Sequence, residues 1–412
     1  MIIDFSVRNF RSIRELQTLA MNAAKIVSKD KILDDRNLIR ISEKLSILKT
    51  KAIYGANASG KSAMIQALSA FINIILNSVK DESILQSEVQ RFKLAQQSIL
   101  APTYFQISFI FKKTYYRYGF EANQQQVIAE WLFGTPGKKE VFFFTRKGTE
   151  IEVNENQFAE GAKVVDIYRQ SDNDIARSNA LFLTVVRSFG RGLASELIDY
   201  FSSYIIIAGL SDFRMHMKAE EAIADEDSRK KIVQLLRFAD TGIEDLTRRE
   251  HKEGSNIYSA ITKHQQFDEK GKPAGTVDLD MLLDESEGTR KMFEMGPALF
   301  QALEQNKVLI VDEFDARFHP LLSRKIVELF NSSNNIGAQL IFATHDTNLL
   351  SSRFLRRDQI GLVEKDKFGA SHFYSLADFK GVRNDASYEK DYIAGKYGAI
   401  PFLGNFKSLT EE

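Results

Sequence analysis

The chain has 412 residues, 44% of them hydrophobic and 27% charged, which is the composition of an ordinary globular protein long enough for two or three domains. Its 55 basic and 55 acidic residues balance, so net charge does not indicate a nucleic-acid partner, although a local basic patch is not excluded. Cysteine is absent, which excludes disulfides, cysteine-bound zinc and a thiol nucleophile.

The N-terminal residues predict a strand and not a targeting signal. Residues 2–8 alternate between apolar and polar, and residues 9–13 follow as a turn. The charged and then apolar layout of a signal peptide is missing, and no apolar run approaches the length that spans a membrane. We therefore expect a cytoplasmic protein with no membrane partner.

A glycine-rich stretch follows a second predicted strand, residues 45–54. The stretch Gly55-Ala-Asn-Ala-Ser-Gly-Lys-Ser62 fits the P-loop pattern at every fixed position. Its glycines let the backbone wrap a phosphate, its lysine reaches the β- and γ-phosphates, and its final hydroxyl ligates Mg²⁺. The residues predicted to bind ATP are Gly55, Ala56, Asn57, Ala58, Ser59, Gly60, Lys61, Ser62 and the next position, Ala63.

The residues after this stretch predict a helix. Apolar side chains recur at helical spacing between residues 63 and 76, so bound phosphates would lie at a helix N-terminus. A chance glycine-rich turn is the alternative. The complete match and the correct flanking elements argue against it.

Strand-like runs return after a polar stretch that ends near residue 98. The first two runs flank Lys112-Lys113-Thr114, which is a hairpin signal, so we expect an antiparallel sheet. Its many aromatic residues would suit base stacking, but aromatic residues are common in strands, and a sheet core is the favoured interpretation. The four runs are residues 104–111, 115–120, 127–133 and 141–145.

The middle of the chain is predicted to be mainly helical. Apolar residues recur at helical spacing from about Asn179 to Arg249, and the charge-rich stretch 218–231 predicts a solvated helix or loop. No heptad pattern persists, so we expect no long coiled coil. Residues 254–276 are polar and contain glycine, which predicts a hairpin tip or a loop.

Two apolar runs near the C-terminus each end in polar residues. Residues 307–311 lead into Asp312 and Glu313, and so short an apolar run suits a strand buried on both faces of a parallel sheet. Asp312 would hold Mg²⁺ through water, and Glu313 would polarise the attacking water. The second apolar run begins at residue 339 and leads into His345. A lone histidine is usually a satisfied polar group, but here we predict a γ-phosphate contact. Glu313, His345 and Lys61 are the predicted catalytic residues.

A helix with one apolar face is predicted just before the acidic strand, and residues 285–290 open it. Ser286 and Gly288 at its N-terminus would suit a phosphate. An N-cap and a turn is the simpler interpretation if the segment is taken alone. Pro297 inside the helix predicts a kink.

In this order, the segments resemble the ABC-type ATPase heads of the SMC-like and RecF-like class. Within that class the chain is most similar to the stand-alone AbiLi/RloA-type ATPases of bacterial abortive-infection and restriction-associated loci, relatives of the PARIS ATPase. The resemblance covers nearly the whole chain. It rests on Asn9-Phe-Arg-Ser12 (opening strand and turn), Glu285-Ser-Glu-Gly-Thr-Arg290 (degenerate signature), Asp312 to Pro320 (Walker B and D-loop), Ala343-Thr-His-Asp346 (switch) and Tyr388 to Pro401 with Gly395-Lys-Tyr-Gly398 (tail).

Two departures from the family pattern stand out. Phe318 replaces the usual leucine before His-Pro, which is a mild change. No glutamine-loop segment is identified, and Gln106 and Gln170 are both left unassigned.

The resemblance implies an α/β fold. It is an ABC-type P-loop ATPase head with a mixed sheet core flanked by helices, an antiparallel β subdomain, a helical insertion and no long coiled coil. The expected domains are residues 1–178 (N-terminal half of the head), 179–280 (mainly helical insertion with a polar hairpin or loop) and 281–412 (C-terminal half). Two heads are expected to form a head-to-tail homodimer or a higher oligomer. Ser286 and Gly288 of one chain would then close over ATP held by Lys61 of the other.

The implied function is an ATP-hydrolysing, Mg²⁺-dependent sensor that switches a separate effector in antiphage defence by abortive infection. The stretch after His345 is too short for a TOPRIM nuclease domain, and the middle region lacks a dense acidic or histidine cluster. We therefore expect the effector, a nuclease or an RNA-targeting protein, to be another polypeptide.

Other functions stay open. A RecF-like DNA-repair ATPase would bind duplex DNA in an ATP-dependent manner. A nucleotide-gated scaffold would bind ATP with little turnover, although Glu313 argues against it. A transporter subunit is disfavoured by the aromatic sheet and by the long insertion between Gly55 and Asp312.

Overall fold

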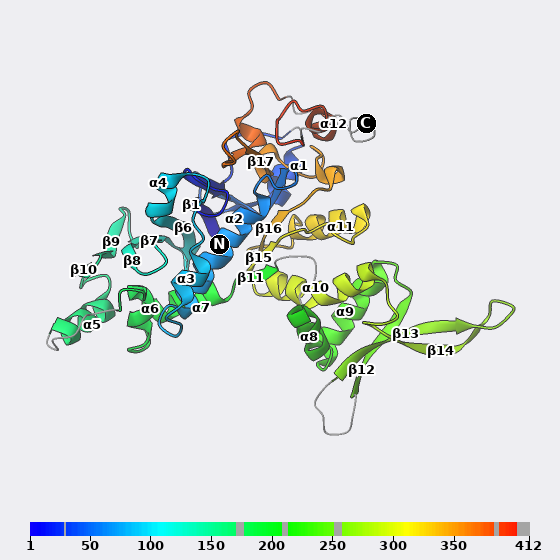
Figure 1. Cartoon of the computed structure of the whole chain (residues 1–412). Helices are drawn as coiled ribbons and strands as arrows, with labels where there is room; N and C mark the ends of the chain where they lie inside the picture. Colours follow the sequence, from blue (N-terminus) through cyan, green and yellow to red (C-terminus); the bar gives the residue numbers. More distant parts are fainter. Residues whose placement is uncertain (29, 170–176, 208–212, 251–257, 383–386, 402–412) are drawn as a thin grey trace, which may run out of the picture.

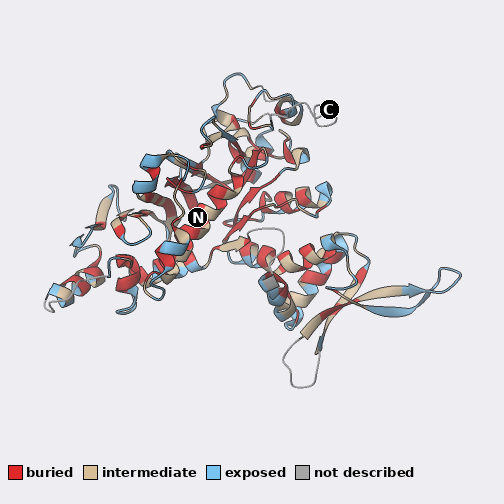
Figure 2. Cartoon of the chain, viewed as in Figure 1, coloured by how far each residue is buried: buried red, intermediate tan, exposed pale blue. Residues whose placement is uncertain are grey.

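The computed structural model describes residues 1–28, 30–169, 177–207, 213–250, 258–382 and 387–401. Its two large sheets differ in strand direction, and helix α2 (Lys61–Asn77) packs between them (Figure 1). Figure 2 shows that buried residues follow these sheets and the helices on them. No helix among the described residues is long and apolar enough to cross a membrane.

The first sheet is antiparallel throughout. Within the described residues it has seven strands in the order β10-β9-β8-β7-β6-β1-β2. Aromatic side chains on its inner face pack on α2, where the Phe71 ring stacks on the Phe120 ring with an angle of 6° between the ring planes and a distance of 5.5 Å between the ring centroids. The strands are β1 (Ile2–Arg8), β2 (Gln17–Ala20), β6 (Thr103–Phe111), β7 (Thr114–Ala122), β8 (Val127–Thr135), β9 (Val141–Lys147) and β10 (Glu150–Val153).

The second sheet is parallel except at one edge. Its order among the described residues is β11-β15-β16-β5-β17-β18, and only β18 runs antiparallel to its neighbour. Strand β15 is buried at every position, as expected for an apolar run covered on both faces. The strands are β5 (Thr50–Gly55), β11 (Ile205–Ile207), β15 (Val308–Val311), β16 (Gln339–Ala343), β17 (Ile360–Lys365) and β18 (Ser371–Ser375).

Shorter elements connect and cover the two sheets. Helices α6 and α7 join the core formed by α2 and the antiparallel sheet. The remaining elements of these parts are α1 (Lys31–Asn37), β3 (Leu38–Arg40), β4 (Ser46–Leu48), α3 (Ile84–Glu88), α4 (Gln96–Leu100), α5 (Ala159–Arg169), α6 (Phe182–Arg187), α7 (Leu193–Ser202), α11 (Pro320–Phe330), α12 (Tyr388–Ile393) and the 3₁₀ turns η1 (Thr347–Leu349), η2 (Arg357–Gln359) and η3 (Leu376–Asp378).

A helical group with its own small sheet lies beside the parallel sheet. The sheet, of order β12-β13-β14 within the described residues, extends away from the body of the molecule (Figure 1). Strand β14 is an edge strand and is exposed along most of its length (Figure 2). The elements are α8 (Phe213–Ala222), α9 (Glu226–Phe238), β12 (Ile243–Glu250), β13 (Tyr258–Phe267), β14 (Pro273–Asp280) and α10 (Glu287–Glu304).

The architecture confirms the expected α/β head with an antiparallel sheet and a helical region, and the described residues contain no long coiled coil. The helical prediction from Asn179 to Arg249 was wrong at two places, because Ile205–Ile207 form β11 and the residues from Ile243 onward belong to β12. Pairing of β11 with β15 and of β12 with β13 decides these conformations, because tertiary context overrides local periodicity. The polar stretch after it forms the β13–β14 hairpin, while Gly254 lies outside the described residues.

The expected division at residues 178 and 280 stays a prediction. Helices α6 and α7 contact α2, and β11 pairs with β15. We therefore propose to count residues 177–207 with the head and to begin the helical insertion at α8.

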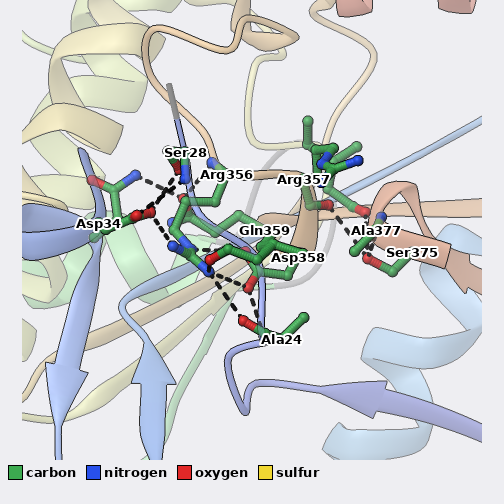
Figure 3. A network of polar contacts seen from close by, with 12 residues as sticks. Ala24, Ser28, Asp34, Arg356, Arg357, Asp358, Gln359, Ser375 and Ala377 are labelled. Atoms are coloured by element: carbon green, nitrogen blue, oxygen red, sulfur yellow. Dashed lines mark hydrogen bonds and ion pairs between the residues drawn. The ribbon is translucent and has the colours of Figure 1, made fainter. Parts of the chain in front are cut away.

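A buried ionic network ties the segment after β2 to the C-terminal half (Figure 3). The Arg356 guanidinium donates to the two carboxylate oxygens of Asp358 at 3.0 and 2.8 Å and also contacts Asp34. Asp358 accepts a further hydrogen bond from the backbone N–H of Ala24 at 2.9 Å. Because Arg356 is 2% exposed, these contacts must offset the loss of its hydration.

Arg356→Met is expected to lower the free energy of unfolding by about 3–5 kcal/mol, because it leaves the buried carboxylate of Asp358 and the half-buried carboxylate of Asp34 without their cation. Urea denaturation of the purified chain measures this change. The matched control is Arg40→Met, which removes an exposed ion pair with Asp35 and should change stability by less than about 1 kcal/mol. Equal losses in the two variants would contradict the role given to the network.

Candidate nucleotide site

The P-loop is wound tightly between β5 and α2, and that path requires both of its glycines. A Cβ atom on Gly55 would lie 2.5 Å from the Val363 carbonyl oxygen. Gly60 has a φ of +114°, and a Cβ atom there would overlap the Ser371 side chain. A side chain at position 55 would therefore push against backbone, and one at position 60 would be strained by the positive φ and would displace the Ser371 side chain.

The loop is supported by two serines from distant parts of the chain. Ser371 Oγ, on β18, lies 2.6 Å from the Ser59 carbonyl oxygen and 2.8 Å from Ser12 Oγ. Ser12 belongs to the turn after β1, whose Asn9 side chain donates to the carbonyl oxygens of Ser98 and Ala101. The opening motif therefore holds the phosphate loop through Ser12. Nothing in the sequence around Ser371 indicated that role.

Lys61 lies at the start of α2 with its side chain buried. Its ammonium donates to the carbonyl oxygens of Gly55 and Ala56 at 2.9 and 3.1 Å. Burial lowers the pKa of Lys61 to about 8, while Asp312, Asp315 and Glu313 act in the opposite direction. An ammonium has three donors, so one N–H remains for a phosphate oxygen.

The carboxylate pair stands at the end of β15, as predicted. The backbone N–H of Glu313 donates to Asp312 Oδ1 at 3.0 Å. Glu313 has a φ of +48°, and its Oε2 atom is buried without a hydrogen-bond partner. The strained backbone and the unsatisfied buried oxygen each cost folding free energy. Such features are common at ligand-binding and catalytic sites.

His345 follows β16 and is joined to the acidic segment by its backbone, whose N–H donates to Asp315 Oδ1 at 3.1 Å. Burial and the nearby Lys61 charge lower the pKa of His345, so its imidazole is neutral at pH 7.

Strands β15, β16 and β5 are parallel neighbours, and their carboxyl ends carry Asp312, His345 and the P-loop to one edge of the sheet.

A cavity of about 600 Å³ opens at this edge, a volume within the range of small-molecule sites. It brings together the first five P-loop residues and His345, with the end of β17 and the C-terminal tail as its other walls. Gly60, Lys61, Ser62, Ala63 and Glu313 lie outside its lining. The lining residues are Gly55, Ala56, Asn57, Ala58, Ser59, His345, Val363, Glu364, Lys365, Tyr392, Ala399, Ile400 and Pro401.

The tail wall is held by tyrosine hydroxyls. Tyr374 donates to the Tyr397 carbonyl oxygen at 2.8 Å, and Tyr392 donates to the Ala399 carbonyl oxygen at 3.0 Å. The sequence placed this tail in the family pattern but gave it no role.

The donors at this edge suit Mg²⁺ only together with a nucleotide. No group of three or more histidine or acidic residues in the described part of the chain is arranged to hold a metal ion. Ser62 and Asp312 are oxygen donors of the kind Mg²⁺ prefers, and Mg²⁺ commonly takes one or two protein ligands together with water and phosphate oxygens.

The predicted signature segment lies away from the cavity. Ser286 Oγ accepts the Thr289 backbone N–H at 3.1 Å and caps α10, as in the simpler interpretation. A Cβ atom on Gly288 would lie 2.8 Å from the Arg317 carbonyl oxygen. Gln106 already accepts from the Trp131 indole N–H at 3.2 Å, and Gln170 lies outside the described residues.

Three solved structures are similar to the chain at low sequence identity. An SMC head bound to the C-terminal winged-helix domain of ScpA has a TM-score of 0.46 and 12% identity, and the match covers 91% of this chain and 97% of that one. The SMC head of Thermotoga maritima has a TM-score of 0.40 and 12% identity, with 91% and 98% covered. A Pyrococcus furiosus SMC head with an extended coiled coil, bound to the C-terminal domain of ScpA, has a TM-score of 0.37 and 12% identity, with 96% and 98% covered.

No curated protein sequence matches the chain. The family described as "AAA domain, putative AbiEii toxin, Type IV TA system" matches residues 52–351. The matched part is well over half of the chain and contains the P-loop, the carboxylate pair and His345. The chain therefore belongs to this AAA family and is a P-loop ATPase.

Proposed function

We propose that this ATPase is a sensor and switch for a separate effector in antiphage defence by abortive infection, as its resemblance to the AbiLi/RloA-type and PARIS ATPases implies. The observation that carries the nucleotide cycle is that β5, β15 and β16 bring Lys61, Glu313 and His345 to one edge of the sheet. The cavity lined by the first five P-loop residues and His345 opens at the same edge. The family description, which names a type IV toxin–antitoxin system, supports the defence context.

Each residue at this edge has a distinct part in ATP hydrolysis. The free N–H of Lys61 binds a phosphate oxygen, and the unpaired Glu313 oxygen orients the attacking water and accepts its proton. The neutral His345 ring donates to the γ-phosphate. Mg²⁺, held by Ser62 and through water by Asp312, would neutralise charge on the phosphates.

We propose a head-to-tail dimer as the hydrolysing form. Ser286 is exposed at the start of α10, where backbone N–H groups favour an anion. With ATP and Mg²⁺, Glu313→Gln should form a tighter dimer than the nucleotide-free protein in analytical ultracentrifugation. Gly288→Asp should lose that dimer, because its carboxylate would repel the γ-phosphate of the facing subunit.

Gly288→Ala is the matched control for the dimer. It places the same Cβ atom against Arg317 without adding a charge, so loss of the dimer only with aspartate indicates repulsion of phosphate. A sedimentation coefficient that is independent of nucleotide in every variant would refute the ATP-dependent dimer.

The switch acts on an effector to the extent that the ATP and ADP states bind that effector differently. We propose that the ATP-bound form holds the effector, a nuclease or an RNA-targeting protein, inactive through the antiparallel sheet and the helical insertion. The exposed strand β14, on the sheet that extends from the body, adds an open edge for such a partner.

Affinity purification after co-expression with the product of the neighbouring gene tests this proposal. We expect a complex with the parental chain in ATP and its loss with Lys61→Ala. If neither chain forms a complex, while the ATPase alone protects cells from phage, the protein is its own effector. ATP-dependent binding of duplex DNA by the purified chain would favour the repair alternative.

A further inference from the structure

Lys291 is a buried cation that the nucleotide chemistry described above does not use. It lies on α10, one turn beyond Gly288, and is 6% exposed. Its ammonium donates to three backbone carbonyl oxygens, those of Glu313 at 2.9 Å, Phe314 at 3.3 Å and Ala316 at 2.7 Å. All three belong to residues 312–319, here called the acidic loop.

Burying an ammonium is expensive unless its donors are satisfied. Burial lowers the pKa of Lys291 to about 8, although Asp315 and Glu313 act in the opposite direction. The ammonium also lies 4.9 Å from the centre of the Phe318 ring. Three carbonyls and an aromatic face together form a binding site for this cation within the chain.

The acidic loop needs such support because its backbone is strained. Glu313 has a φ of +48° and Arg317 a φ of +69°, conformations that non-glycine residues rarely adopt and keep only when their surroundings hold them. The carbonyl oxygen of Glu313 is one of the Lys291 acceptors. Lys291 therefore holds the backbone of Glu313, the residue whose side chain is the proposed base.

Two more contacts join the start of α10 to the same loop. Gly288 lies so close to Arg317 that a side chain would meet its carbonyl oxygen, and Glu287 forms an ion pair with Arg317 at 3.2 Å. Helix α10 and the acidic loop are thus packed as one unit within a single chain.

We propose that Lys291 is a positioning residue that fixes the Glu313 side chain relative to the nucleotide by holding the acidic loop against α10. This inference rests on the role proposed for Glu313. In a head-to-tail dimer, the contact between Lys291 and the acidic loop would also couple the two nucleotide sites. The start of α10 would face the partner's ATP, so a shift of α10 on closing would pass through Lys291 to the chain's own Glu313 and link the two sites.

Lys291→Met and Lys291→Gln, made in the whole chain, test whether Lys291 holds the acidic loop in place. Methionine fills a similar volume without donors, and glutamine keeps one donating group, so the second variant decides the question if the first does not fold. We expect kcat to fall by about 10- to 100-fold, because a displacement of about 1 Å at a reacting group has an effect of that size. The Kd for ATP should stay unchanged, since Lys291 touches no P-loop residue.

A double-mutant cycle separates positioning from general damage. In the Glu313→Gln background, Lys291→Met should cause no further loss of kcat, because the residue it positions has already lost its function. Lys230→Met is the matched control, since Lys230 is exposed and pairs with Glu226, and its kcat should equal that of the parent. An undiminished kcat in the Lys291 variants, or losses that multiply in the cycle, would overturn the proposal.

Hydrogen–deuterium exchange provides a readout that does not depend on turnover. Peptides covering residues 313–319 should exchange faster in the Lys291 variants, while peptides from α2 should not change. If Glu313→Gln hydrolyses ATP at the parental rate, Glu313 is not the base, and this result is separate from the question of whether Lys291 holds the loop. Unchanged exchange in the acidic loop would instead show that Lys291 does not hold it.

Discussion

Glu313→Gln should bind ATP as tightly as the parent while its turnover falls by about 10²- to 10⁴-fold. The amide keeps the size of the side chain but cannot accept a proton from the attacking water. The Glu313 Oε2 atom has no hydrogen-bond partner in the protein, so the substitution breaks no internal hydrogen bond at that atom. Steady-state hydrolysis and equilibrium nucleotide binding, measured on the same preparation, separate the two effects.

Glu226→Gln is the matched control for this variant. Glu226 lies at the exposed start of α9, where it pairs with Lys230, so turnover should be unchanged. A Glu313→Gln protein that hydrolyses ATP at the parental rate would remove Glu313 from the mechanism.

Lys61→Ala should lose ATP binding. Its ammonium is held beside Gly55 and Ala56 with one N–H free, and alanine removes both the positive charge and the donor. A hydrogen bond to a charged group contributes about 1.5–3 kcal/mol, which corresponds to roughly 10- to 150-fold in affinity, and the loss of charge neutralisation adds to it. Isothermal titration with ATP and Mg²⁺ measures the change.

Lys230→Ala is the control for the loss of a lysine, because this side chain is exposed and distant in sequence from the P-loop. Thermal unfolding without nucleotide should give similar transitions for both variants and the parent. An ATP affinity equal to that of the parent in Lys61→Ala would mean that the phosphates bind elsewhere.

The parts of the site that the sequence predicted are those with short-range signals. The P-loop pattern needs only eight consecutive residues, and the apolar runs before Asp312 and His345 became β15 and β16. Parallel pairing then brings their ends together, so their proximity follows from strand order.

The rest depends on contacts between distant residues. Ser12 and Ser371 are 359 positions apart, and no local pattern relates them. Ile243 and Leu246 are spaced as on a helix, yet both belong to β12, because its pairing with β13 decides their conformation. Lys291 stands beside a recognised motif, but only the fold shows that its ammonium meets the acidic loop.

The position of β5 in its sheet has a consequence for how the protein is made. Both neighbours of this strand, β16 and β17, come from residues 339–365. During translation the P-loop strand therefore leaves the ribosome long before either partner exists. Unpaired apolar strands are prone to aggregate and slow to find distant partners. We expect nascent chains that end before residue 339 to need chaperones and to lack ATP binding, so the nucleotide cycle begins only after β16 and β17 have been made.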